Sequence, residues 1–241
     1  MSNTVKKLGG LPLNYVVFDV ESTGLDMHND VAIQLGYALV INKEIVDCSS
    51  YVADWTHGRP PDFCDWLDVR MKNTKKNMES KAGAGSYRHS LERMKSSGIP
   101  ACDAFLGFID TIEFCKSYNF SFVAHNGLKF DQPLLDKCAK QLWGETSGFN
   151  VGEKYFDTMA LERGCQSMIT PDSLDNWFSF TKRMINEGGK FYSSLSNHCD
   201  KKYNLIDKHN LRGSAHEADF DCKLTHHLFE EFRVMAERGN N

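Results

Sequence analysis

Four acidic residues and one histidine, spread over three short segments, have the types and spacing of a divalent-metal site. They are Asp19 and Glu21, Asp131, and His216 with Asp221. Asp19 and Glu21 follow an apolar run directly, and side chains two residues apart on a strand point to the same face. Two carboxylates that converge in this way repel each other unless a cation lies between them. Oxygen ligands favour Mg²⁺ or Mn²⁺, so the pattern predicts that these ions bind here.

Each segment has a simpler explanation when it is considered alone. Two acids at a strand end are more often a solvated turn, Asp131 could cap a helix, and a lone histidine is more often structural. Together, four carboxylates could hold two ions roughly 4 Å apart, which stabilise the attacking water and the leaving oxygen of a phosphodiester. A neutral histidine can take the proton from that water, and we assign this role to His216. The set predicts metal-dependent phosphodiester hydrolysis that weakens on acidification.

The spacing between His216 and Asp221 restricts where the histidine can lie. Five residues at about 100° each separate the two side chains by about 140°, so they cannot share a helix face. We therefore expect His216 at or before the start of the helix that carries Asp221. Ser214 and Glu217 fit a capping box that would begin this helix at Ala215, although the sequence alone leaves the cap undecided.

Apolar periodicity predicts the elements that position these residues. Strands are expected at 14–20, 31–40, 45–52, 120–124 and 155–156, and helices at 102–118, 132–143, from 157 through 163, and 217–238. The first three strands have short links and should form an antiparallel meander. Strands that then alternate with helices predict an α/β fold with a mixed sheet. We find no internal repeat or linker, and expect a single domain over residues 1–241.

Composition limits the class of protein. The chain has 241 residues, of which 41% are hydrophobic and 25% charged, with a formal net charge of −4. Overall charge therefore does not predict a nucleic-acid partner, and any basic surface must be local. No apolar run approaches the roughly 20 residues that span a bilayer, and we see no signal peptide. The eight cysteines are scattered without zinc-site spacing, which favours free thiols and an intracellular, cytoplasmic location.

The three segments, in this order, resemble the motifs of the DEDDh (DnaQ-like) 3′→5′ exonucleases. Phe18-Asp-Val-Glu-Ser-Thr-Gly-Leu25 is similar to the first motif, Ala124-His-Asn-Gly-Leu-Lys-Phe-Asp131 to the second, and His216-Glu-Ala-Asp-Phe-Asp221 to the third, H-x-A-x-x-D. The stretch 156–161 is similar to a supporting strand and helix start. Similarity covers roughly 14–54 and 101–232.

The resemblance implies a ribonuclease H-like fold with a five-stranded mixed sheet flanked by helices. It implies two Mg²⁺ or Mn²⁺ ions per site, held by Asp19, Glu21, Asp131 and Asp221, with His216 as general base. It also implies release of nucleoside 5′-monophosphates from a free 3′ end. Ser22, Thr23 and Leu25 match positions that line the terminal-nucleotide pocket, and His125 and Asn126 lie near it.

Two features depart from the family pattern. Gln34 stands where many relatives carry Glu, and residues 69–98 form an insertion. The insertion contains eight Lys and Arg residues against two Glu, a net charge of +6. It could be a basic flap that grips the nucleic-acid backbone through Lys72, Lys75, Lys76 and Arg88, or a solvated surface segment.

These observations leave three functions to compare. The first is a 3′→5′ exonuclease acting on single-stranded nucleic acid or on the 3′ ends of duplexes, with DNA slightly favoured over RNA. The second is a non-catalytic nucleic-acid-binding module, or one associated with a polymerase or another replication or repair partner. The third is a metal-dependent endonuclease or other phosphodiesterase. The intact set of five residues favours the first. Oligomeric state and the choice between DNA and RNA stay open.

Overall fold

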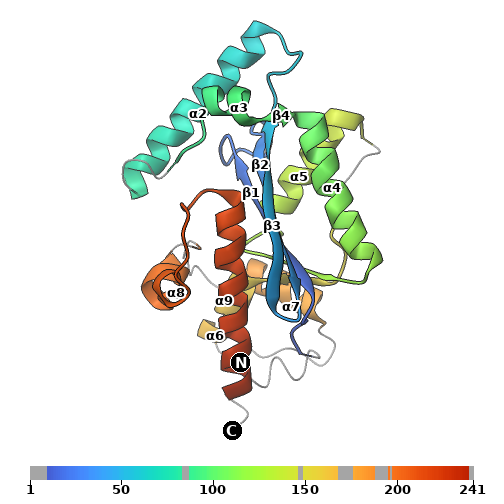
Figure 1. Ribbon diagram of the computed structural model, residues 1–241, viewed down its shortest axis with the longest axis vertical. Helices are drawn as coiled ribbons and strands as arrows, with labels where there is room; N and C mark the ends of the chain where they lie inside the picture. The colour runs from blue at the N-terminus through green and yellow to red at the C-terminus, as the bar shows by residue number, and fades with distance from the viewer. Residues whose placement is uncertain are drawn as a thin grey trace.

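The computed structural model describes residues 10–82, 87–145, 149–167, 176–187, 195 and 197–238. Its strands are β1 (Tyr15–Ser22), β2 (Ala32–Ile41), β3 (Glu44–Asp54), β4 (Ile99–Pro100), β5 (Ser121–Ala124) and β6 (Tyr155–Asp157). They form one mixed sheet in the order β4-β3-β2-β1-β5-β6 (Figure 1). β1, β2 and β3 are the predicted antiparallel meander, and β5 and β6 continue the sheet parallel to β1.

The sheet has six strands where five were predicted. The additional strand, β4, consists of two residues that pair with the end of β3 in parallel. A pairing this short has no alternation of apolar and polar residues, which is the signal by which strands are recognised in a sequence. The five predicted strands are all present.

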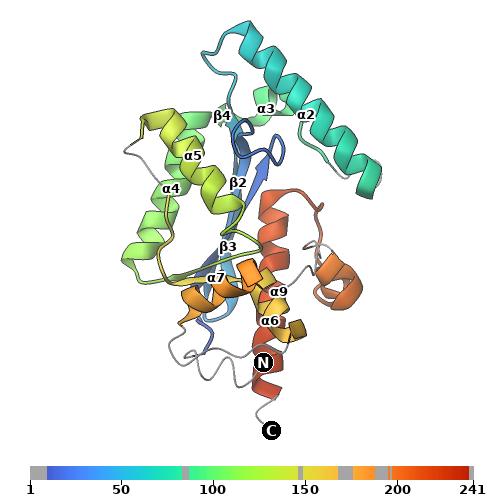
Figure 2. The same cartoon turned by 180° about the vertical axis from the view of Figure 1, so that it is seen from behind.

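Helices lie on both faces of the sheet. They are α2 (Pro61–Ala82), α3 (Leu91–Ser97), α4 (Ala101–Ser117), α5 (Asp131–Trp143), α6 (Thr158–Ser167), α7 (Trp177–Glu187), α8 (Leu205–Lys208) and α9 (Ala218–Arg238), with a short π-helix, η1 (Asn197–Lys202). Figures 1 and 2 both show α4 and α5 side by side along the sheet, and α9 running from the middle of the molecule toward one end. None of the helices in the described residues is long and apolar enough to cross a membrane.

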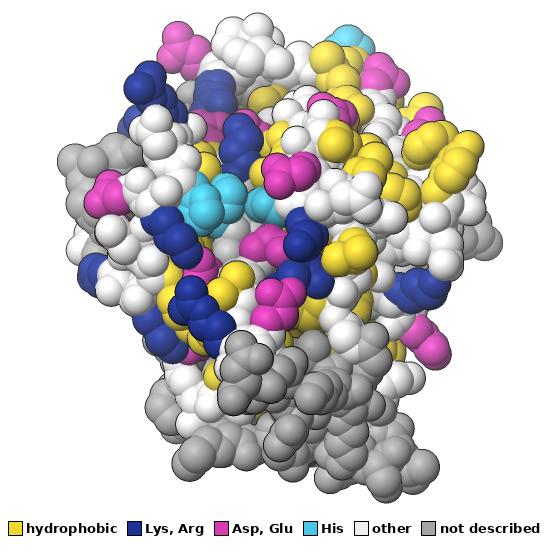
Figure 3. Space-filling model, turned by 60° about the horizontal axis from the view of Figure 1, so that its bottom comes forward, with side chains coloured by type: hydrophobic (Ala, Val, Ile, Leu, Met, Phe, Trp, Pro, Cys, Tyr) yellow, Lys and Arg dark blue, Asp and Glu magenta, His cyan; other side chains and the backbone are white. Residues whose placement is uncertain are grey.

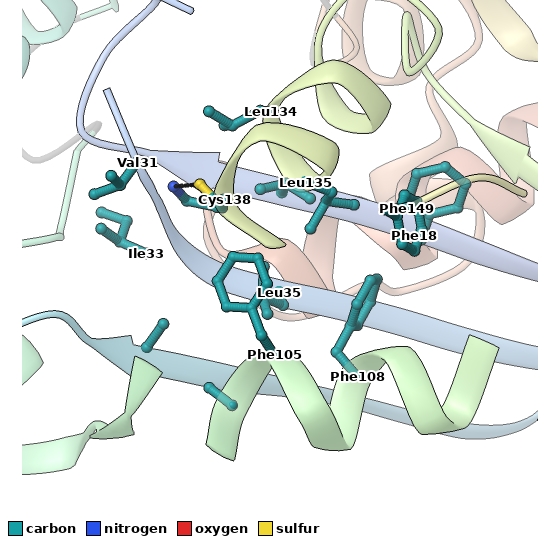
Figure 4. Packing of buried hydrophobic residues seen from close by; sticks show 14 of the residues in the cluster. Phe18, Val31, Ile33, Leu35, Phe105, Phe108, Leu134, Leu135, Cys138 and Phe149 are labelled. Carbon is teal, nitrogen blue, oxygen red and sulfur yellow. Dashed lines mark hydrogen bonds between the residues drawn. The ribbon is translucent and has the colours of Figure 1, made fainter. Parts of the chain in front are cut away.

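Alternate residues of β1 supply the two hydrophobic cores. Val16 and Phe18 point into the core under α4 and α5, whereas Tyr15 and Val17 point into the core under α6, α7 and α9. Figure 4 shows the first of these cores, with phenylalanines from α4 facing leucines from β2 and α5. Because β1 is covered on both faces, it is apolar at every position before Asp19. The candidate active-site residues therefore begin where the continuous apolar run of β1 ends.

The helix of the third motif, α9, begins later than a capping box would place it. α9 starts at Ala218, and the amide of Glu217 donates to the carbonyl oxygen of Ser214 at 3.2 Å in a turn. The Glu217 carboxylate is bound by Arg93 instead of reaching back to cap the helix. His216 consequently lies before α9, as the spacing argument requires.

The insertion is largely helical in its described part. α2 spans 22 residues but buries few apolar side chains, Leu67 and Met71 among them, and α3 follows at 91–97. The buried apolar residues lie in the first half of α2 and the sequence after them is mostly polar, so the helix was not predicted. α7 was likewise not predicted. The eight cysteines are free thiols, and four of them are buried.

Candidate active site

The ends of three elements bring the four predicted acids together. Asp19 and Glu21 lie on β1, Asp131 is the first residue of α5, and Asp221 lies in the first turn of α9. Burial raises the pKa of Asp19 well above its usual value, and the negative charges of Asp221, Asp131 and Glu21 raise it further. Asp19 is therefore the centre of a cluster of four carboxylates, as the sequence predicted.

Asp131 is joined directly to the first motif. Its Oδ1 accepts a hydrogen bond from the backbone N–H of Val20 at 2.9 Å, and its side chain is almost completely buried. Burial raises the pKa of Asp131 to about 8, although the Val20 N–H opposes this and the charges of Asp157 and Glu21 add to it. The helix N-cap expected as the simpler explanation is not its role, because Asp131 lies inside α5 and its carboxylate faces β1.

His216 and Asp221 meet through the backbone. The N–H of His216 donates to Oδ2 of Asp221 at 3.1 Å, and His216 has a left-handed backbone with φ +65°. Nδ1 of His216 lies 3.7 Å from Oε1 of Glu21. Glu21 raises the pKa of His216, while burial opposes the shift. Burial, followed by the charge of Glu21, raises the pKa of Asp221 to about 7, although His216 lowers it.

The donor set suits a hard divalent cation. Glu21, His216 and Asp221 each offer a ligand atom, and these atoms all lie within 4.8 Å of one another. Asp19 and Asp131 lie close to this group and would contribute further oxygens. A bound cation would remove the repulsion that raises the pKa values of these acids, because it replaces protons as the compensating charge. The residues present therefore fit oxygen-coordinated metal ions.

Two residues of β2 allow α9 to approach this closely. Gly36 is opposite Asp19 in the sheet, and a Cβ atom there would lie 2.5 Å from the backbone carbonyl carbon of Ala218. Gln34 accepts the Ala218 N–H with Oε1 at 3.3 Å and donates from Nε2 to Oγ of Ser50 at 2.9 Å. Gln34 thus orients the first turn of α9 without adding another charge to the acid cluster. A glycine inside a strand is the sequence signal for such an approach.

The residues of the first motif that follow Glu21 mostly make hydrogen bonds within their own loop. Oγ1 of Thr23 donates to Oδ1 of Asp30 at 2.9 Å, and Oγ of Ser22 donates to the carbonyl oxygen of Gly24 at 2.5 Å. Both side chains are buried, whereas Leu25 is 81% exposed. Of these three predicted substrate-binding residues, Leu25 is therefore the one with an exposed side chain.

An ion pair between distant segments fixes that loop. Nε and Nη2 of Arg70 on α2 donate to Oδ1 and Oδ2 of Asp30 at 3.0 and 2.7 Å, and the Asp30 side chain is buried. Oγ1 of Thr74 also donates to the carbonyl oxygen of Thr23. Sequence reasoning did not identify Asp30, because its partner lies 40 residues away and no local pattern marks it.

A buried carboxylate also holds the loop of the second motif. Oδ1 of Asp157 accepts the N–H of Asn126 at 3.0 Å, and Asn126 is left-handed with φ +65°. Nδ1 of His125 and Oγ1 of Thr158 lie 2.9 Å apart. Burial raises the pKa of Asp157, although the Asn126 N–H and the Tyr155 hydroxyl oppose this. His125 and Asn126 are thus tied to β6 and α6, next to Asp131.

The residues predicted to contact a nucleic-acid backbone lie on the insertion in two groups. Lys72, Lys75 and Lys76 are exposed on α2, and Lys72 pairs with Asp68 at 2.5 Å. Arg88 is exposed and, with Arg212, lines a hollow of about 430 Å³ beside residues 213–217. On the face that Figure 3 shows, Lys and Arg side chains are interspersed with Asp and Glu around several histidines. That face is therefore not a continuous basic surface.

The fold is similar to that of E. coli exonuclease I, while no protein-family model and no curated protein matches the sequence. The complex of that enzyme with a dT13 oligonucleotide has a TM-score of 0.55 and 12% identity, covering 94% of this chain and 42% of that chain. The zinc-bound complex with single-stranded DNA has a TM-score of 0.52 and 11% identity, covering 95% and 42%. The product-bound structure has a TM-score of 0.53 and 11% identity, covering 93% and 44%.

This chain therefore spans less than half the length of the exonuclease I chains that it matches. At these identities the similarity establishes the fold alone, which this chain shares with the part of exonuclease I that it matches.

Proposed function

We propose that this protein is a metal-dependent 3′→5′ exonuclease that releases nucleoside 5′-monophosphates from a free 3′ end. The observation that carries the proposal is the convergence of Asp19, Glu21, Asp131 and Asp221 beside His216, at the end of β1. The similarity of the fold to exonuclease I supports it. We further propose that residues 1–241 act as one exonuclease domain.

The four carboxylates would hold two Mg²⁺ or Mn²⁺ ions. When bound, these ions stabilise the negative charge on the attacking and leaving oxygens of a phosphodiester. His216 removes a proton from the attacking water. Because Nδ1 faces Glu21, we assign Nε2 as the atom that accepts this proton. Glu21 then stabilises the imidazolium, which is consistent with the raised pKa of His216. Activity should fall on acidification, since a protonated His216 cannot accept a proton.

The proposed substrate is a single-stranded 3′ end or the 3′ end of a duplex, with DNA slightly preferred to RNA. Exonuclease I has been solved with dT13 and dA16 oligonucleotides, which supports a single-stranded ligand for the shared fold. Exposed Leu25 would contact the terminal nucleotide, and Arg88 would contact a phosphate near the third motif. His125 and Asn126 would support the terminal nucleotide from the loop of the second motif.

A digestion experiment tests this proposal. Purified protein is incubated with 5′-labelled single-stranded DNA, single-stranded RNA and duplex DNA of matched sequence, with Mg²⁺, Mn²⁺ or EDTA. We expect a ladder of products shortened from the 3′ end with either metal and none with EDTA. Asp19→Asn and His216→Ala should both abolish the ladder while the circular dichroism spectrum is unchanged. Asp110→Asn, an exposed acid on α4, is the matched control and should digest normally.

The same substrates distinguish the alternatives. A 3′-phosphate on the DNA should block an exonuclease that needs a free 3′ hydroxyl, whereas an endonuclease would still cut. A non-catalytic binding module, including one associated with a polymerase, would retard the DNA in a gel without shortening it. Near-normal digestion by Asp19→Asn would refute the site assignment.

A further inference from the structure

Residues 87–90, which lead into α3, reach the candidate active site in an extended form. Tyr87 and His89 are buried, at 2% and 4% exposure, while Arg88 and Ser90 between and after them are exposed. Alternating burial is what an extended chain shows when one face lies against the protein. We call residues 87–93 the strap. It belongs to the insertion and contains none of the five predicted catalytic residues.

The strap contacts the first and third motifs at three points. The Tyr87 hydroxyl donates to the carbonyl oxygen of Ser22 at 3.0 Å. Nε2 of His89 lies 2.8 Å from the carbonyl oxygen of His216, and the histidine must be the donor because a carbonyl oxygen can only accept. Nη1 and Nη2 of Arg93 donate to the two carboxylate oxygens of Glu217 at 2.5 and 2.7 Å. Each contact thus falls on a motif segment that carries a predicted active-site residue.

The strap is itself attached firmly to the sheet. Oγ of Ser90 accepts the N–H of Arg93 at 3.1 Å and so caps α3, whose Met94 is buried in the core. α3 leads into β4, where Ile99 pairs with Ala53 at the end of β3. The rings of Tyr87 and His89 pack edge to face with centroids 5.2 Å apart. Motions of the strap relative to the sheet are therefore restricted at both of its inward-facing side chains and at α3.

The two contacts with the third motif matter because of the backbone conformation at His216. A left-handed conformation is unfavourable for any residue with a Cβ atom and persists only where surrounding contacts enforce it. Here the N–H of His216 is held by Asp221, its C=O by His89, and the next residue, Glu217, by Arg93. Two of these three constraints come from the strap. The direction of the His216 imidazole follows from this backbone conformation.

We propose that Tyr87, His89 and Arg93 are positioning residues that set the direction of the His216 imidazole and hold the third motif against the first. The proposal rests on the proposed function, in which His216 is the base. The three residues touch backbone atoms or Glu217, so they act through the motifs and are not themselves catalytic. A displacement of about 1 Å can cost roughly a hundredfold in rate.

Kinetics of strap variants test the proposal. His89→Phe keeps a ring for Tyr87 but removes the donor, and we expect kcat to fall roughly 10- to 100-fold with KM within about twofold. His89→Gln restores an N–H donor and should recover part of kcat. Arg93→Met should lower kcat similarly, and Arg93→Lys less. Glu92→Gln, exposed on α3 next to Arg93, is the control and should match the wild type.

Hydrogen–deuterium exchange provides a readout that does not depend on activity. His89→Phe and Arg93→Met should speed exchange in peptides covering residues 214–218 while core peptides from β1 and β2 stay unchanged. Unchanged kcat or unchanged exchange at 214–218 in both variants would overturn the proposal. A general loss of protection across the protein, without recovery in His89→Gln, would also overturn it. If the wild type digests no substrate, the proposed function fails and the exchange data alone decide the role of the strap.

Discussion

Asp131→Asn should make the metal-free protein more stable, and this gain should grow as the pH rises. Burial raises the pKa of Asp131 to about 8 from a usual value of 3.8. Between these values the folded protein keeps a proton on Asp131 that the unfolded chain releases. The unfolded state therefore binds fewer protons, so the free energy of unfolding falls as the pH rises. Asparagine retains an oxygen for the Val20 N–H but never ionises. The variant therefore does not lose this part of its free energy of unfolding as the pH rises.

The size of the effect follows from the range of pH. One proton held against its usual pKa costs about 1.4 kcal/mol for each pH unit. From pH 5 to pH 7 the stability of Asp131→Asn relative to wild type should therefore increase by about 3 kcal/mol. This is large beside the roughly 5–15 kcal/mol by which domains are usually stable.

The comparison with the variant is needed because other groups titrate in the opposite direction. Burial lowers the pKa of His226 to about 4 and that of His227 to about 3. Below pH 6.5 the unfolded chain binds protons that these folded histidines do not, so they add stability as the pH rises. The wild-type profile alone would mix the two effects, whereas the difference between wild type and Asp131→Asn isolates the carboxylate.

Urea unfolding followed by tryptophan fluorescence measures this difference in EDTA at about pH 5, 6 and 7. Addition of Mg²⁺ or Mn²⁺ at pH 7 should stabilise the wild type by ligand linkage and the variant much less, reversing their order. Asp110→Asn, exposed on α4, should show neither effect. If the gain of Asp131→Asn does not grow with pH in EDTA, the Asp131 carboxyl is not buried as a group that needs a proton or a cation, and the metal-site assignment fails.

Three further changes test the supports of the site. Gly36→Ala places a methyl group 2.5 Å from the backbone at the start of α9, and should cost about 1–3 kcal/mol in urea unfolding and at least roughly tenfold in turnover. Arg70→Met leaves the buried carboxylate of Asp30 without its cation, and should cost about 3–5 kcal/mol, with part of the loss recovered in Arg70→Lys. The double substitution Lys75→Gln and Lys76→Gln should weaken binding of single-stranded DNA and reduce its dependence on salt. The slope of the logarithm of the binding constant against the logarithm of the salt concentration should become shallower by about 0.7 for each lost phosphate contact. An unchanged slope would show that these lysines do not touch the backbone.

Local geometry explains which parts of the site the sequence could predict. Asp19 and Glu21 share a strand face because side chains alternate with a period of two, and the cluster confirms that they converge. The separation of His216 and Asp221 excludes a common helix face, and His216 lies before α9. Both inferences need only the periods of strand and helix. The five predicted strands rest on the same kind of local signal.

The parts that the sequence could not predict depend on partners far along the chain. Arg70 meets Asp30 across 40 residues, and His89 meets the carbonyl oxygen of His216 across 127. α2 has its buried apolar residues in its first half, and polar contacts of Arg70 and Thr74 with the loop after β1 help to hold it. The sequence consequently left the insertion open between a basic flap and a solvated surface segment, and its later part lies against the first and third motifs.

The length and direction of α9 decide where a reporter can be attached to the protein. Its first turn carries Asp221, and its 21 residues end at Arg238, which is about 25 Å from Asp221 along the helix. Near that end, Nη1 of Arg233 donates to the carbonyl oxygen of Leu11 at 2.8 Å, so the first described residues lie there too. A fluorophore or surface tether linked at this end stays far from the carboxylates. Single-molecule measurements could therefore follow the shortening of a strand without the label crowding its 3′ end.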